Sequence, residues 1–165
     1  MNILFTDDDG NIVTPDENKA CEVALAYLAK TIKPDEKFDN SRSVSMFASP
    51  KIGGKLQEHF MIMCLDSRLR LISDHIVHIG TTSVVSVSPK DIFRTAIKDN
   101  ANCIIALHNH PSMNPTPSNE DISLTAKLIL AGRMIDIPVM DHVIVTAKGT
   151  FCSFRDSLPE FWNIT

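Results

Sequence analysis

Residues 102–121 read NCIIALHNHPSMNPTPSNED, an apolar run followed by two histidines one residue apart. The run 102–108 predicts a short strand that ends at His108. Successive side chains of an extended backbone point to opposite sides, so His108 and His110 should face one side and Asn109 the other. The sequence therefore predicts two imidazoles that project together from the end of a strand.

A proline-rich loop leads from these histidines to a predicted helix. Its three prolines stiffen the chain, and the first of them ends the strand: Pro111, Pro115 and Pro117. Ser118 begins the helix, and Asp121 falls in its first turn. Because a stiff loop of this length can return the helix start to the strand end, Asp121 is expected beside His108 and His110.

Two neutral imidazoles and one carboxylate are a ligand set that suits Zn²⁺. Three protein ligands leave a fourth position for water, which is typical of a catalytic zinc site. A water in that position has its pKa lowered towards ~7, so hydroxide is available at neutral pH. From the residues alone two alternatives stay open, a plain helix cap formed by Ser118 and Asp121, and histidines that are merely solvated in a loop.

The sequence around this stretch predicts strands and helices in mixed order. Strands are expected over 59–65, 69–80, 137–145 and 149–154, the first two paired antiparallel. The helix that begins at Ser88 is expected to bury Ile92, Phe93, Ala96 and Ile97, and the helix over 118–132, with Gly132 near its end, to bury Ile122, Thr125 and Ile129. This order favours a single mixed sheet flanked by helices.

The first 43 residues predict an extension to this α/β region. The apolar triplets on either side of an Asp-Gly turn predict a hairpin over 2–14. The sequence TPDE, residues 14–17, begins a helix expected to run to residue 31. The polar, turn-rich stretch 33–43 is expected to be a linker or an exposed loop.

The composition is that of an ordinary globular protein, with 165 residues, 44% of them hydrophobic and 22% charged. There is no apolar run of membrane-spanning length and no signal-peptide pattern at the N-terminus, so a cytoplasmic location without a membrane partner is expected. The formal net charge of −4 disfavours a nucleic-acid partner, although a basic patch formed only in the folded chain stays open. The four cysteines are far apart and are expected to be buried, reduced thiols: Cys21, Cys64, Cys103 and Cys152.

Strand, H-x-H, seven residues and S-x-x-D together resemble the JAMM motif of the JAB/MPN metallopeptidases. The stretches SPKDIFRTAIKDNANCIIALHNHPS and PSNEDISLTAKLILAGRMIDIPVMDHVIV are similar to the RadC-like branch of that family. The resemblance covers residues 42–155, which leaves 1–41 as an N-terminal hairpin and helix and 156–165 as a C-terminal tail. It implies a cytidine-deaminase-like JAB/MPN fold of the α/β class, a mixed sheet sandwiched by helices, with the metal at the end of the strand that closes with His108.

The same resemblance implies roles for individual side chains. His108, His110 and Asp121 would hold Zn²⁺. Glu58 would take a proton from the metal-held water and return it to the leaving amine, and Ser118 would donate a hydrogen bond to the oxyanion.

Other residues carry weaker expectations. The pair Asp141-His142 interrupts an apolar strand, and the RadC-like family has the same pair there, so a place behind the zinc ligands and a plain core pair both stay open. Met113 stands where the family usually has Gly, which puts the shape of the loop and the access of substrate in question. His75 and His78 are expected to be structural.

The leading expectation is a JAMM-type zinc metallopeptidase that acts on a peptide or an isopeptide-linked protein. The alternatives are a non-catalytic, zinc-containing binding module and a DNA-repair-associated factor, the second implied only by the label of the RadC-like family. The helix-hairpin-helix region that precedes this domain in longer relatives is not expected in residues 1–41. The sequence indicates neither the natural substrate nor the oligomeric state.

Overall fold

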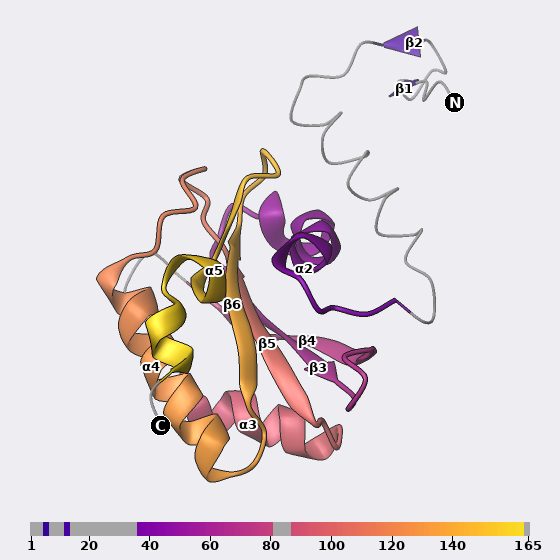
Figure 1. The fold of residues 1–165 in the computed structure, drawn as a ribbon. Coiled ribbons are helices and arrows are strands. Elements are labelled where there is room, and N and C mark those ends of the chain that lie inside the picture. The colour runs from indigo at the N-terminus through magenta and orange to yellow at the C-terminus, as the bar shows by residue number, and fades with distance from the viewer. Residues whose placement is uncertain (1–4, 7–11, 14–35, 81–86, 164–165) are drawn as a thin grey trace.

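The computed structural model describes residues 5–6, 12–13, 36–80 and 87–163. Five strands form one sheet in the order β4-β3-β5-β6-β7 (Figure 1). Their bounds are β3 His59–Leu65, β4 Leu71–Ile79, β5 Cys103–Asn109, β6 Val139–Val145 and β7 Phe151–Ser153. Only β5 and β6 pair in parallel; every other neighbouring pair is antiparallel. The mixed sheet expected from the sequence is confirmed.

Helices cover both faces of this sheet. The helix α2, Ser41–Ala48, continues into a π-helical turn, Ser49–Gly53, on one face. The helices α3, Pro89–Lys98, and α4, Asn119–Met134, lie on the other face (Figure 1). Two short segments, α5 Phe154–Ser157 and η2 Pro159–Trp162, end the described chain. This is the α/β sandwich that the resemblance implied.

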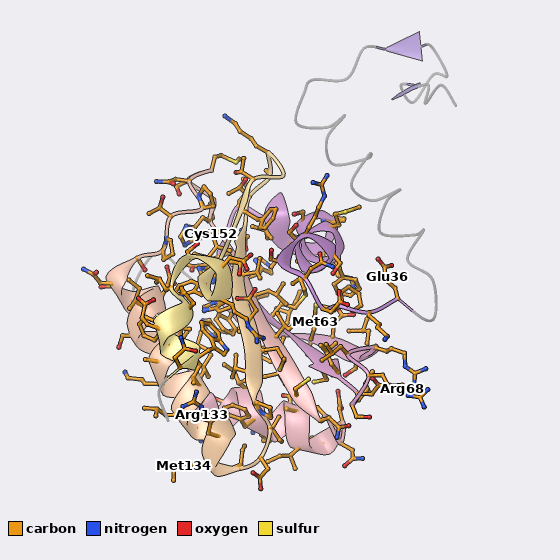
Figure 2. All side chains as sticks on the ribbon, in the orientation of Figure 1. Glu36, Met63, Arg68, Arg133, Met134 and Cys152 are labelled. Carbon is orange, nitrogen blue, oxygen red and sulfur yellow. The ribbon has the colours of Figure 1, made fainter. Side chains whose placement is uncertain are left out.

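The strand β3 is apolar from Phe60 to Leu65 because both of its sides are covered there. Its alternate side chains enter two separate clusters. The cluster beneath α2 receives Met61, Met63 and Leu65, and the cluster beneath α3 and α4 receives Phe60, Ile62 and Cys64. Figure 2 shows Met63 within the crowded interior, whereas Arg68 and Met134 lie at the periphery.

The prediction of a linker or exposed loop over 33–43 holds only in part for the residues that the structure describes: Lys37, Asp39 and Asn40 are exposed and lie before the helix, but Phe38 and the residues from Ser41 on depart from it. Phe38 is buried, and its amide donates to the Leu69 carbonyl at 2.9 Å. The helix α2 begins at Ser41, and no helix was predicted there. The first half of α2 is interrupted by Ser41, Ser43 and Ser45, so its helical periodicity is not apparent before the sheet beneath it is known.

The predicted buried faces of the two longer helices need smaller corrections. Ile97 is exposed, since it lies about 140° around α3 from the buried Ile92. On α4 the buried face is centred on Leu128, which was not among the predicted residues, and Ile122 is only half-buried. The last strand is also shorter than predicted, because Phe154 already belongs to α5.

Near the N-terminus, β1 Phe5–Thr6 and β2 Ile12–Val13 pair antiparallel, in agreement with the predicted hairpin. Its turn and the helix predicted over 14–31 lie outside the described residues. None of the helices in the described part of the chain is both long and apolar enough to cross a membrane. Three cysteines are described and all are free; Cys64 and Cys103 are buried, but Cys152 is partly exposed, so the expectation of burial fails there.

Candidate metal centre

The end of β5 and the start of α4 meet on the α3–α4 side of the sheet (Figure 1). His108 is the sixth residue of β5, His110 directly follows that strand, and Asp121 lies in the first turn of α4. Glu58 immediately precedes β3, which pairs with β5 so that Phe60 lies opposite His108. One ligand atom from each of Glu58, His108, His110 and Asp121 lies within 4.8 Å of all the others. The fold therefore assembles four side chains singled out from the sequence.

The side chains of His108, His110 and Asp121 have ligand atoms that are spaced as they would be around one small ion. The Nε2 atoms of His108 and His110 are 3.0 Å apart. Asp121 Oδ1 lies 3.2 Å from His108 Nε2, and Asp121 Oδ2 lies 3.4 Å from His110 Nε2. Tetrahedral zinc with bonds of about 2.0–2.1 Å separates its ligand atoms by about 3.3–3.4 Å. The residues therefore fit a zinc ion both in donor type and in spacing.

The ring orientation of His110 is decided by its other nitrogen. His110 Nδ1 lies 2.8 Å from the Asn114 carbonyl oxygen. Because a carbonyl only accepts, Nδ1 must carry the proton. In the neutral ring Nε2 is then unprotonated and turns its lone pair towards Asp121, as a metal ligand requires.

A longer chain of hydrogen bonds fixes His108 in the same way. The Thr125 hydroxyl donates its single proton to the Asp121 carbonyl at 2.6 Å, so it can only accept from His142 Nδ1, also at 2.6 Å. Neutral His142 then has an unprotonated Nε2, which accepts from His108 Nδ1 at 2.8 Å. The Asp121 backbone carbonyl at one end of these hydrogen bonds thus fixes the proton of His108 on Nδ1. His108 Nε2, at the other end, is therefore the unprotonated ligand atom.

His142 and Asp141 point to opposite sides of β6, and only His142 reaches the cluster. Burial lowers the pKa of His142 well below its ordinary value, with a further contribution from His108, which agrees with the neutral ring required by the chain. Asp141 accepts hydrogen bonds from the Ser153 hydroxyl at 2.6 Å and the Arg155 amide at 3.0 Å. Burial raises the pKa of Asp141 although these bonds oppose it.

The charge of the cluster is concentrated on Asp121. Burial alone would raise the pKa of its carboxyl, but the adjacent imidazoles of His108 and His110, which donate to it when they are protonated in the metal-free protein, outweigh burial and hold that pKa well below its usual range. The bond to Asp121 in turn raises the pKa of His110, with burial opposing it. A carboxylate that stays ionised among imidazoles is suited to hold a divalent cation.

Ser118 forms a reciprocal capping box with Asp121. Its hydroxyl and its amide donate to Asp121 Oδ2 at 2.6 and 2.8 Å, and its oxygen accepts from the Asp121 amide at 3.1 Å. The cap anticipated from the sequence is therefore present. The same bonds orient the metal-facing carboxylate, so the cap and the metal cluster share one pair of residues.

Glu58 stands slightly outside the tight triangle of ligands. Its side chain is 52% exposed, and its carboxylate lies 3.6 Å from His108 Nε2. Because zinc with three protein ligands keeps an open position, an acid beside that position and open to solvent is placed to exchange a proton with a bound water.

Met113 occupies the left-handed region of backbone conformation, with φ at 63°. Its amide donates to the His110 carbonyl at 3.1 Å, closing the turn that presents the Asn114 carbonyl to His110. The backbone explains why glycine suits this position, since a residue with Cβ is strained there.

Two contributors to the site, Asn114 and Thr125, were not predicted as site residues. Asn114 acts only through its carbonyl, which the sequence cannot reveal, and Thr125 was predicted only as part of the buried face of α4. The histidines of β4 lie apart from the cluster. His75 Nε2 contacts Asp99 Oδ2 at 2.5 Å, which anchors β4 to the end of α3.

The comparisons with known proteins place the chain in a family. The model of the family described as "RadC-like JAB domain" matches residues 38–158. Proteins named UPF0758 are 31% identical over 144 residues in Methanosarcina barkeri and 40% identical over 121 residues in Thermotoga maritima. These matches cover 84% and 73% of this chain but 62% and 54% of the two relatives. The chain thus spans little more than half the length of the curated relatives it matches.

Proposed function

Because this chain belongs to the RadC-like JAB domain family, we propose that it is a zinc-dependent hydrolase of peptide or isopeptide bonds. The observation that carries the proposal is the cluster of His108, His110, Asp121 and Glu58, with three ligand-spaced side chains and one exposed acid. The family match over residues 38–158 includes the whole stretch 42–155, which contains all four.

Zinc in this site would lower the pKa of a bound water and polarise the scissile carbonyl. His108, His110 and Asp121 would hold it through the two Nε2 atoms and the carboxylate. The Glu58 carboxylate would take the proton from the attacking water and deliver it to the leaving nitrogen. The Ser118 hydroxyl would turn from Asp121 to donate to the oxyanion, which would require its present bond at 2.6 Å to open.

The two alternatives are weaker on the same observations. A non-catalytic binding module has no need of an exposed acid beside the ligands, yet Glu58 lies there. A DNA-associated factor is disfavoured by the formal charge of −4. Asp141 acts in this proposal only as a core residue, and His142 as the support behind His108.

The first test is metal content, measured by mass spectrometry on full-length protein purified without added metal. We expect about one zinc per chain in the parent, as one ligand set of three implies, and none in His110→Ala. His75→Ala, which removes an imidazole outside the cluster, is the matched control and should keep its zinc. A folded parent without metal, or a His110→Ala variant that retains it, would overturn the assignment of the site.

The second test is hydrolysis, assayed on a panel of linear peptides and of peptides joined through a lysine ε-amide. Glu58→Gln should keep zinc and lose about 10²–10⁴-fold in turnover, the usual contribution of a general base. Equal turnover by parent and variant would show that Glu58 is not the base. A zinc-loaded parent that cleaves nothing in the panel would favour the binding module.

A further inference from the structure

Asn109 lies between the two histidine ligands, but its side chain is on the opposite face of β5. His108 and His110 project into the metal cluster, whereas Asn109 is fully buried on the side of α2. It therefore does not face the metal. A buried amide needs partners for its two donors and its acceptor, and these partners show what the residue does.

All three groups of the Asn109 amide bind the backbone on both sides of Glu58. Its Oδ1 accepts from the His59 amide at 2.7 Å. Its Nδ2 donates to the Lys55 carbonyl at 3.0 Å and to the Gln57 carbonyl at 3.2 Å. Glu58 thus lies between two residues, Gln57 and His59, that are both tied to the same side chain.

Glu58 depends on this backbone support because its own side chain is half-exposed. Its carboxylate contacts His108 at 3.6 Å, beyond hydrogen-bond distance. A further restraint on its backbone comes from the residue after β4, since the Gly80 amide donates to the Glu58 carbonyl at 2.7 Å. The place of the carboxylate relative to the metal ligands is therefore set by backbone contacts.

We infer that Asn109 is a positioning residue that holds Glu58 at the metal centre, an inference that rests on the proposed role of Glu58 as the proton acceptor. The tripeptide His108–His110 then does two tasks at once. Its outer residues supply ligands on one face of β5, and its middle residue fixes, from the other face, the segment that carries the acid. One strand, β5, thereby determines both the position of the metal and the position of the Glu58 carboxylate relative to it.

Only an asparagine meets these demands at this position. Aspartate has the same shape and keeps an acceptor for the His59 amide, but it offers no donor to the Lys55 and Gln57 carbonyls. Alanine removes all three bonds. Asn109→Asp is therefore the sharper variant, and Asn109→Ala is the second, in case a buried carboxylate prevents folding.

The control must separate this effect from a general loss of stability. Met63→Val also trims a fully buried side chain of the α2 face, but in the middle of β3 and away from Glu58. All variants are made in the full-length chain. Zinc affinity, measured by competition with a chromophoric chelator, should stay within about threefold of the parent, since His108, His110 and Asp121 are unchanged.

Two readouts need no substrate. Amide hydrogen exchange followed by NMR should be at least about tenfold faster at His59 in Asn109→Ala, which removes the acceptor of that amide, relative to amides of β6. Met63→Val should not show this local change. In cobalt-substituted protein the visible absorption spectrum reports the surroundings of the metal, and Asn109→Asp should shift it in the same way as Glu58→Gln.

With any peptide that the parent cleaves, Asn109→Asp should lower kcat about 100-fold and leave KM unchanged, the effect of a misplaced catalytic group. Unchanged amide hydrogen exchange at His59 would overturn the inference that Asn109 restrains the backbone around Glu58. Faster exchange together with a parent-like cobalt spectrum and kcat would make Asn109 purely structural. If the parent cleaves nothing, the proposed function fails, and exchange and the cobalt spectrum still decide whether Asn109 positions Glu58.

Discussion

The orientation of each histidine of the metal centre depends on a backbone carbonyl oxygen, a partner that cannot be identified from the sequence. For His108 that oxygen belongs to Asp121, two side chains away through His142 and Thr125. Hydrogen-bond partners of this kind orient a ligand ring and raise its basicity, and their loss typically weakens metal binding about 10–100-fold. Thr125→Val, which keeps the shape of the side chain but removes its hydroxyl, should therefore weaken zinc binding by at least about tenfold.

The helix α3 offers a matched control for that substitution. The Thr95 hydroxyl also donates to the carbonyl four residues earlier, that of Asp91 at 3.2 Å, but far from the cluster. Thr95→Val should leave zinc affinity at the parent value in the same chelator competition. Equal affinities in Thr125→Val and Thr95→Val would show that the chain behind His108 does not tune the metal.

The strained residue of the histidine loop gives a prediction about stability. A left-handed conformation costs a residue with Cβ about 1–2 kcal/mol, and glycine avoids that cost but loses about 0.5–1 kcal/mol of chain entropy. Met113→Gly should therefore raise the free energy of unfolding by about 0.5–1 kcal/mol and keep zinc. Urea unfolding of zinc-free protein measures the change.

Asn100, whose φ is 51°, is the comparison for Met113. Asparagine adopts this conformation with little strain, so Asn100→Gly should gain less than Met113→Gly. A Met113→Gly variant less stable than the parent would mean that packing of the Met113 side chain outweighs the backbone strain.

At the scale of single elements, α4 shows how a correct residue can be predicted for the wrong reason. Gly132 was expected near the helix end, and it lies two residues before Met134, the last residue of α4, so it does not itself end the helix. A Cβ on Gly132 would lie 2.5 Å from the Ile137 carbonyl oxygen and 3.1 Å from Phe93 Cζ. The glycine is required because α3 and the chain entering β6 approach α4 closely there, and a sequence does not show such tertiary contacts.

Gly132→Ala should therefore destabilise the protein although alanine favours helices. The clash with backbone should cost about 1–3 kcal/mol, more than the gain of about 1 kcal/mol in helix propensity. Ser123→Ala, on the exposed side of the same helix, tests propensity alone and should raise stability slightly. Thermal unfolding of both variants measures these changes in stability. A Gly132→Ala variant more stable than the parent would mean that Ile137 and Phe93 move away from the new Cβ at little cost.

The elements that could be predicted were those whose pattern is local. The strand before His108, the cap at Ser118 and the apolar β3 follow from period, proline and capping signals. The helix α2 could not be predicted, because its buried face has meaning only against the sheet that Met61, Met63 and Leu65 build beneath it. The hydrogen bonds from the Asn109 side chain to the backbone around Glu58 were missed for the same reason, since the bonded residues are 50–54 residues away along the chain.

At the scale of the whole molecule, the metal centre joins parts of the chain that are far apart in sequence. Asp121 belongs to α4, His108 to β5, and Glu58 precedes β3; the strand order β4-β3-β5-β6-β7 brings them to one end of the sheet. A bound ion would therefore tie the start of α4 to the end of β5, with Glu58 beside it. Zinc should then stabilise the entire fold, because it binds the native arrangement and not the unfolded chain.

This stabilisation should depend on pH in a direction that the pKa shifts determine. The pKa of His110 in the metal-free protein is raised above 6.5, chiefly by Asp121, so protons compete with zinc for its Nε2 from neutral pH downwards. A raised pKa also means that protonated His110 favours the metal-free fold below pH 6.5 and ceases to do so as pH rises through the folded value. Lower pH therefore favours protonation of His110 and weakens the binding of zinc.

We expect zinc at 100 times its Kd to contribute about 2.7 kcal/mol at pH 8, or an increase in Tm of about 5–10 °C for a chain of this size. The increase should shrink below pH 7 and disappear near pH 5, where His110 is protonated. Differential scanning calorimetry with zinc or with a chelator measures it, and His110→Ala should show no increase at any pH. An increase that persisted unchanged to pH 5 would mean that zinc binds without His110, through the other side chains of the cluster.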